Sequence, residues 1–239
     1  KKNEVFSCEA LNSKDAWQIF PAFSPDGKSL YFSSTAAVDS ISKNFRQMTY
    51  SLCRVDFDPE TRTLGQQVDT LYNGRANHKS VSFPRISPDG KYLLYSSSKE
   101  NITQRPFSLS SLFQVNLETL AVDTLFFEDR FLGGASYSPD GKQLLLTASP
   151  EAFDGIGKNC GNHPIANDFD SQAFIMDLAT RKIDPITKEF NPSVNFLQWN
   201  KGDGCIYFST NDEDCRNIYR YSPKDRKFEK LNLETDVTS

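Results

Sequence analysis

Apolar and polar residues alternate along this chain in short runs, and three of these runs follow the same pentapeptide. "SPDGK" occurs at residues 24–28, 87–91 and 138–142. Each copy lies between two stretches of five to seven residues in which apolar and polar residues alternate. A period of two over such lengths is typical of half-buried β-strands, and Pro-Asp-Gly is typical of a tight turn between antiparallel strands. The pattern predicts three β-hairpins with the same turn.

Alignment on the pentapeptide extends the similarity beyond the hairpin. The flanks read FPAF-SPDGK-SLYFSS, FPRI-SPDGK-YLLYSSS and GASY-SPDGK-QLLLTAS, and a fourth, degenerate copy reads FLQW-NKGDG-CIYFST. Further strand-like runs follow each copy: SLCRVDF, SLFQVNL, QAFIMDL and NIYRYSP. A polar turn and another strand-like run come after each of these, so each unit is predicted to contain four short strands.

Four-stranded antiparallel sheets repeated along a chain bury their faces by packing around an axis, which predicts an all-β fold, the β-propeller. We expect one propeller domain over residues 1–239, with residues 1–12 as the outer strand of a preceding or closing blade. A closed four-bladed ring and a part of a larger propeller both fit this pattern. The expected blades cover residues 18–72, 82–127, 132–190 and 194–234.

The spacing within the units locates the insertions. The third strand begins 27, 24, 34 and 17 residues after the first turn residue in units one to four, so units one to three have 10, 7 and 17 extra residues between their second and third strands. In an antiparallel blade this connection lies at the opposite end from the SPDGK turn. Because loops carry binding functions more often than the strands they join, we expect ligands at the insertion end.

The repeat [F/Y]-S-P-D-G-K-x-L-x-[F/Y/L]-[S/T] resembles the WD40-like repeat of TolB-type β-propellers. The same repeat occurs in the N-terminal propeller of prolyl oligopeptidase and dipeptidyl-peptidase relatives, and units three and four look most like those of Bacteroidetes-type bacteria. The resemblance covers residues 17–239 and implies a non-catalytic module that binds or gates peptide or protein ligands. The alternative it implies is a stand-alone periplasmic interaction scaffold.

In the peptidases of this resemblance the catalytic triad lies on a separate α/β-hydrolase domain. The 239 residues contain no G-x-S-x-G motif and no strand–helix alternation. We therefore expect no catalytic residue, cofactor or metal site in this chain, and any peptidase activity to reside in a C-terminal hydrolase domain of the parent chain. The resemblance also implies a periplasmic, cell-envelope or secreted location.

Composition limits the classes of partner that we expect. The net charge is −4 and the charges are interspersed, so the sequence has no basic stripe that would bind nucleic acid. It also has no run of 18 apolar residues, so no membrane span is predicted. Five cysteines at irregular spacing leave two interpretations open. They are buried apolar residues, or Cys205 and Cys215 form a disulfide across one hairpin.

The longest insertion, DGIGKNCGNHPIANDFD (residues 154–170), is the most distinctive irregular segment. Its glycines do not follow a dinucleotide-binding pattern, and its Cys, His and Asp residues do not follow a zinc-ligand spacing. We expect a structured loop that contributes to ligand binding, together with the histidine of the first crossover. The candidate ligand-binding residues are Gly157, Asn159, Asn162, His163, Asp168 and His78.

Overall fold

A computed structural model describes residues 16–35, 49–74, 76–77, 79–105, 108–159, 170–190, 192–212 and 215–232. The chain divides into two compact units, Lys1–Pro84 and Arg85–Ser239, and each is treated separately below. The division falls within β5. The predicted strand at residues 1–12 lies outside the described residues.

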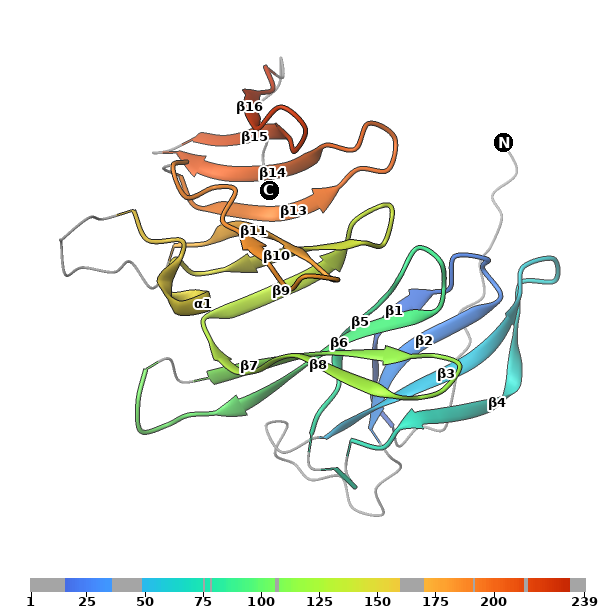
Figure 1. The fold of residues 1–239 in the computed structure, drawn as a ribbon. Helices are drawn as coiled ribbons and strands as arrows, with labels where there is room; N and C mark the ends of the chain where they lie inside the picture. Colours follow the sequence, from blue (N-terminus) through green and yellow to red (C-terminus); the bar gives the residue numbers. More distant parts are fainter. Residues whose placement is uncertain are drawn as a thin grey trace. The chain divides into compact units, whose positions relative to one another are not determined.

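The predicted all-β fold of four-stranded blades is confirmed (Figure 1), because the described strands form four antiparallel sheets of four strands each. Blade 1 contains β1 (Gln18–Phe23), β2 (Ser29–Thr35), β3 (Tyr50–Asp58) and β4 (Thr63–Tyr72). Blade 2 contains β5 (Ser82–Ile86), β6 (Tyr92–Glu100), β7 (Ser108–Asn116) and β8 (Val122–Arg130). Blade 3 contains β9 (Leu132–Tyr137), β10 (Gln143–Ala148), β11 (Gln172–Asp177) and β12 (Ile183–Asp184). Blade 4 contains β13 (Val194–Trp199), β14 (Ile206–Asp212), β15 (Cys215–Ser222) and β16 (Lys227–Lys230).

Each sheet is a meander in which consecutive strands pair. One end of every blade therefore carries the turns between its first and second and between its third and fourth strands, and we call it the turn end. The other end, the connection end, carries the loop between the second and third strands and the crossover to the next blade. In the part of the chain that the structure describes, no helix has the length and apolarity of a membrane span.

The SPDGK turns are built alike. In the first, Ser24 Oγ donates to Asp26 Oδ1 (2.5 Å) and accepts from the Ser29 amide (2.9 Å), while Asp26 Oδ1 also accepts from the Lys28 amide (3.0 Å). The following Gly27 has φ +70°, a left-handed conformation that glycine adopts without strain. The same bonds recur around Ser87 and Ser138, so the predicted turn chemistry is confirmed.

The first strands of three blades share a feature that the alternation does not predict. Phe20, Phe83 and Phe196 each lie four residues before the turn and have φ between +51° and +56°. The pairing of β1 with β2 and of β13 with β14 shifts register around Phe20 and Phe196. These shifts are β-bulges, which turn the phenylalanine away from the alternating pattern and leave Phe196 80% exposed.

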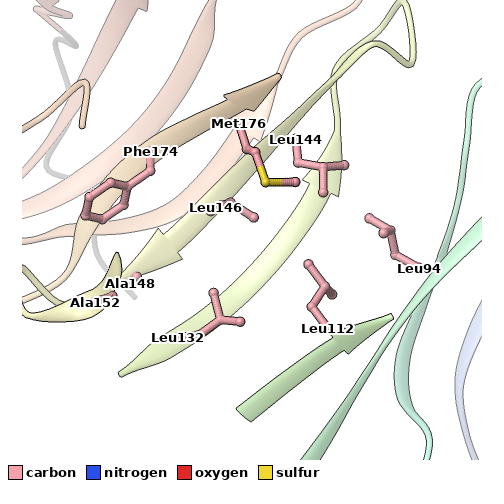
Figure 2. Close-up of a cluster of buried hydrophobic side chains, with 9 residues drawn as sticks. All are labelled: Leu94, Leu112, Leu132, Leu144, Leu146, Ala148, Ala152, Phe174 and Met176. Carbon is pink, nitrogen blue, oxygen red and sulfur yellow. The ribbon is translucent and has the colours of Figure 1, made fainter. Parts of the chain in front are cut away.

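The core of the second unit lies between neighbouring blades. Figure 2 shows Leu94 and Leu112 of blade 2 beside a row of blade 3 side chains that includes Leu144 and Phe174, both fully buried. A second cluster joins blades 3 and 4 through Ile175, Phe208 and others. Each such large apolar side chain contributes about 1.5–3 kcal/mol by burial. In the first unit, the buried cluster is Leu30, Phe32, Cys53 and Val55.

The structure corrects the cysteine interpretations. Cys205 precedes β14, whereas Cys215 begins β15 at the other end of the hairpin, where it pairs with Asp212. Strand residues advance about 3.3 Å each, so the two thiols are too far apart for a disulfide. Cys53 and Cys205 are buried free thiols, as expected, but Cys215 is exposed. Cys8 and Cys160 lie outside the described residues.

Candidate functional site at the connection end of blades 2 and 3

Two of the six candidate ligand-binding residues lie in the described part of the longest insertion. Gly157 is buried, and a Cβ there would lie 3.0 Å from Phe174 Cζ and 3.0 Å from Pro150 Cα. Asn159 is exposed, and its Nδ2 donates to the Lys188 carbonyl oxygen at 3.0 Å. Gly157 thus lets the chain pack closely, while Asn159 presents a polar side chain to solvent. The other four, Asn162, His163, Asp168 and His78, lie outside the described residues.

A single helical turn, α1 (Ala152–Gly155), anchors the start of this insertion beside the core. Phe153 has φ +55°, and its ring lies 5.0 Å from that of Phe126 in β8 and 5.1 Å from that of Phe174 in β11. Asp154 follows with φ +59° and is exposed. Left-handed conformations of non-glycine residues cost energy, of order 1–3 kcal/mol, and the aromatic packing holds Phe153 in one.

An ion pair joins the two sides of the turn. Lys158 Nζ lies 2.6 Å from Glu151 Oε2, and the Glu151 side chain is only 18% exposed. Among the described residues, no donor reaches the buried Oε1 of Glu151 or the buried Oε1 of Gln172. The base of the insertion is therefore rich in acceptors.

Carboxylates also gather at the neighbouring end of β8. Asp129 is half-buried, and its pKa is raised above the usual range, first by burial and further by the negative charge of Asp154. The adjacent Glu128 forms an ion pair with Lys99 at 2.9 Å. Such a surface favours cationic or N–H donor groups on a ligand. Within the described residues, no three metal-ligating side chains lie together.

A cavity of about 450 Å³ lies at the opposite, turn end, between blades 3 and 4. Across it, Arg226 donates to Asp184 through both terminal nitrogens, at 2.7 and 3.1 Å. Burial raises the pKa of Tyr221, which also lines the cavity. Because Arg226 and Asp184, which face each other across it, already neutralise one another, this cavity is a weaker candidate than the connection end.

Sequence reasoning missed Phe153 and Asp129, although both have a recognisable signal. "EAFDG" begins three residues after the last residue of the second strand of blade 3, and "EDR" ends the fourth strand of blade 2. Residues that end a strand or closely follow one on the connection side belong to the same surface as the insertion. Their left-handed backbone and half-burial depend on packing, which a single sequence does not reveal.

Comparison with solved structures identifies the fold. TolB from Acinetobacter baumannii matches with a TM-score of 0.58 and 19% identity, over 92% of this chain and 44% of that one. The fold is that of a TolB-like β-propeller. A puromycin-hydrolysing peptidase from Mycobacterium tuberculosis matches this propeller with a TM-score of 0.64 and 12% identity, over 93% of this chain and 32% of that one.

An oligogalacturonate lyase from Vibrio parahaemolyticus has the same fold, with a TM-score of 0.53 and 14% identity over 87% of this chain and 62% of that one. The chain thus spans less than two thirds of each of these three proteins. No protein-family model matches the sequence, and no curated protein matches it either. Similarity at this level identifies the fold and leaves the function to the site.

Proposed function

We propose that this chain is a non-catalytic β-propeller module that binds or gates peptide or protein ligands at the connection end of its blades. The observation that carries the proposal is the contrast in loop length. Between second and third strands lie 14, 7, 23 and 2 residues in blades 1 to 4, whereas the first turn has the same construction in blades 1 to 3. Variation concentrated at one end is expected where loops bind and strands support them.

In this proposal the exposed Asn159 contacts the ligand, and the buried Gly157 lets the backbone before it pack closely. The other binding residues are Asn162, His163, Asp168 and His78. The acceptor-rich base of the insertion and the half-buried Asp129 suit a ligand with N–H or ammonium donors, as peptides provide. No nucleic acid, cofactor or metal takes part in it. We place the protein in the periplasm, the cell envelope or the secreted fraction.

The version we favour is the propeller part of a dipeptidyl-peptidase-like serine peptidase, with the catalytic triad on a hydrolase domain outside these residues. The similarity to a peptidase over 93% of this chain supports it. The second candidate is a stand-alone TolB-like protein interaction scaffold, which the similarity to TolB over 92% of this chain supports.

Calorimetric titration with short peptides that carry proline at the second position tests the proposal. We expect the intact chain to bind, and a variant in which residues 160–169 are replaced by a Gly/Ser linker to bind at least about tenfold more weakly, a loss of 1.4 kcal/mol. A matched control, Lys28→Ala at the turn end, should bind like the wild type.

Three results would contradict parts of this proposal. Equal peptide binding by the linker variant removes the insertion from the site. Hydrolysis of a prolyl-dipeptide chromogenic substrate by this chain contradicts the non-catalytic assignment. Binding of a folded protein partner with no binding of any peptide favours the scaffold over the peptidase module.

A further inference from the structure

The cavity at the turn end of blades 3 and 4 contains a buried hydroxyl group that has no partner. Tyr221 lines this cavity and is only 2% exposed, and its ring packs against that of Phe228 at 4.8 Å. No hydrogen bond joins its hydroxyl to another described residue. Because buried hydroxyls in proteins are normally hydrogen-bonded, this group is available to a ligand.

Four charged side chains line the cavity, and two of them neutralise each other. Arg226 donates to Asp184 through both terminal nitrogens. The amide and hydroxyl of Thr180 both donate to Asp177 Oδ1 at 2.8 Å and lower the pKa of that carboxyl, so it is ionised at neutral pH. Among the described residues, neither Asp177 nor Lys182 has an ion-pair partner. The lining therefore offers one cation and one carboxylate to a ligand.

The repeat shows which of these groups the packing of neighbouring blades uses. The equivalent junction of blades 2 and 3 keeps the ion pair between blades, in the form of Arg181 and Asp123 at 2.5 Å. It does not keep the two other polar groups, because the strand register places apolar residues at their positions. These equivalents are Ala121 for Lys182 and Met176 for Tyr221. The ion pair is thus part of the framework, whereas the ammonium and the hydroxyl are additions at blades 3 and 4.

We propose that this cavity binds a free α-amino acid with an apolar side chain. Its carboxylate pairs with Lys182 and accepts a hydrogen bond from the Tyr221 hydroxyl, and its ammonium group pairs with Asp177. Ile175 and Ile183 provide the apolar part of the lining for its side chain. The site is separate from the connection end and does not depend on the proposed function.

The size and the charge balance of the cavity support this class of ligand. Its volume of about 450 Å³ lies within the range of about 300–1,000 Å³ that is usual for small-molecule sites. Its two cations and two carboxylates sum to zero, which suits a zwitterion better than a polyanion or a polycation. Burial raises the pKa of Tyr221, so its hydroxyl keeps its proton and can donate at neutral pH.

Calorimetric titration of the intact chain with L-leucine and its blocked analogues tests the class of ligand. We expect L-leucine to bind with a Kd of about 1 mM or tighter. Leucinamide has no carboxylate for Lys182, and N-acetylleucine has no ammonium group for Asp177. Each should bind at least about tenfold more weakly than L-leucine, because each loses a charge-assisted hydrogen bond.

Two substitutions test the residues. Lys182→Ala introduces the side chain found at the equivalent position of blade 2, and it should weaken L-leucine binding at least about tenfold while leaving leucinamide binding unchanged. Tyr221→Phe keeps the ring that packs on Phe228 and should weaken L-leucine binding about threefold. Lys91→Ala, at the turn end of blade 2, is the matched control and should bind L-leucine like the wild type.

Four results would overturn the inference. They are no L-leucine binding up to about 10 mM, equal binding of L-leucine and leucinamide, unchanged L-leucine binding by Lys182→Ala, and tighter binding of a dipeptide than of L-leucine. The variant with a linker at residues 160–169 should bind L-leucine like the wild type. Loss of L-leucine binding there would place the ligand at the connection end and overturn this site, whereas loss of peptide binding alone concerns only the proposed function.

Discussion

The turn end and the connection end of the blades differ in how much their structure varies from one blade to the next. At the turn end, one arrangement recurs, in which the aspartates of SPDGK accept bonds from a serine hydroxyl and an amide, and the pKa of each carboxyl is lowered. At the connection end, the loops between second and third strands all differ in length, Phe153 is held in a left-handed conformation, and the pKa of Asp129 is raised. The repeated turn end therefore supports the fold, and the variable connection end provides the surface that is available for binding.

Substitution of two glycines of blade 1 tests this difference between the two ends, and it should give the largest effect on stability. A Cβ at Gly74, at the connection end, would lie 2.1 Å from the Tyr50 carbonyl oxygen and 2.7 Å from that of Lys79. Backbone atoms cannot move aside, so Gly74→Ala should lower the free energy of unfolding by about 3 kcal/mol. Denaturant unfolding of the purified variant measures this.

Gly27→Ala is the matched control at the turn end. Nothing lies within 4 Å of its Cβ position, so the cost comes from its φ of +70° alone. That strain costs about 1 kcal/mol. Equal losses from both substitutions would show that the connection end is no more tightly packed than the turn.

The buried serine of the third turn should give the next largest effect. Ser138 is 1% exposed, and its Oγ donates to Asp140 at 2.6 Å and accepts from the Gln143 amide at 3.0 Å. Ser138→Ala leaves that amide without its partner and should cost about 1–2 kcal/mol in unfolding free energy. Ser138→Thr keeps the hydroxyl and serves as the control, and a loss as large from it would assign the effect to packing.

The sequence predicted the blades because their signal is local. SPDGK specifies a hairpin, and the alternation after it specifies which face of each strand is buried. The left-handed conformations of Phe20, Phe83 and Phe196 were not predicted, because phenylalanine has no local preference for a positive φ and the conformation depends on packing. At the candidate site, the sequence located the insertion through its length. It could not place Phe153 between Phe126 and Phe174, which are distant in sequence.

The contrast in pKa directions predicts opposite responses to acid. The lowered pKa of Asp140 means that its ionised form stabilises the fold above the unfolded value, about 3.9, and that this contribution is lost as pH falls through the folded pKa. Asp129 has a raised pKa, so its charge opposes folding at neutral pH, and protonation relieves that opposition as pH falls toward the unfolded value.

Thermal unfolding between pH 2 and 7 measures both. Asp140→Asn should lower the midpoint at pH 7 and flatten its fall in acid. Asp129→Asn should leave the midpoint at pH 7 unchanged or raise it. A lower midpoint at pH 7 for Asp129→Asn would mean that its carboxylate is stabilised by a favourable partner, contrary to the burial seen at the connection end.

The smallest effect is expected at the surface of the turn end, where Arg226 bridges blades 3 and 4. Its side chain is 63% exposed and that of Asp184 39%, so solvent screens the pair despite its two hydrogen bonds. Arg226→Met keeps most of the aliphatic stem and should lower the unfolding free energy by about 0.5 kcal/mol, a loss that shrinks in 1 M salt. The double variant with Asp184→Asn should lose no more than the single one. A loss above about 2 kcal/mol that salt does not change would show that the Arg226–Asp184 ion pair contributes strongly to the packing of blades 3 and 4. The stability of the turn end would then depend on this ion pair as well as on the repeated hairpin.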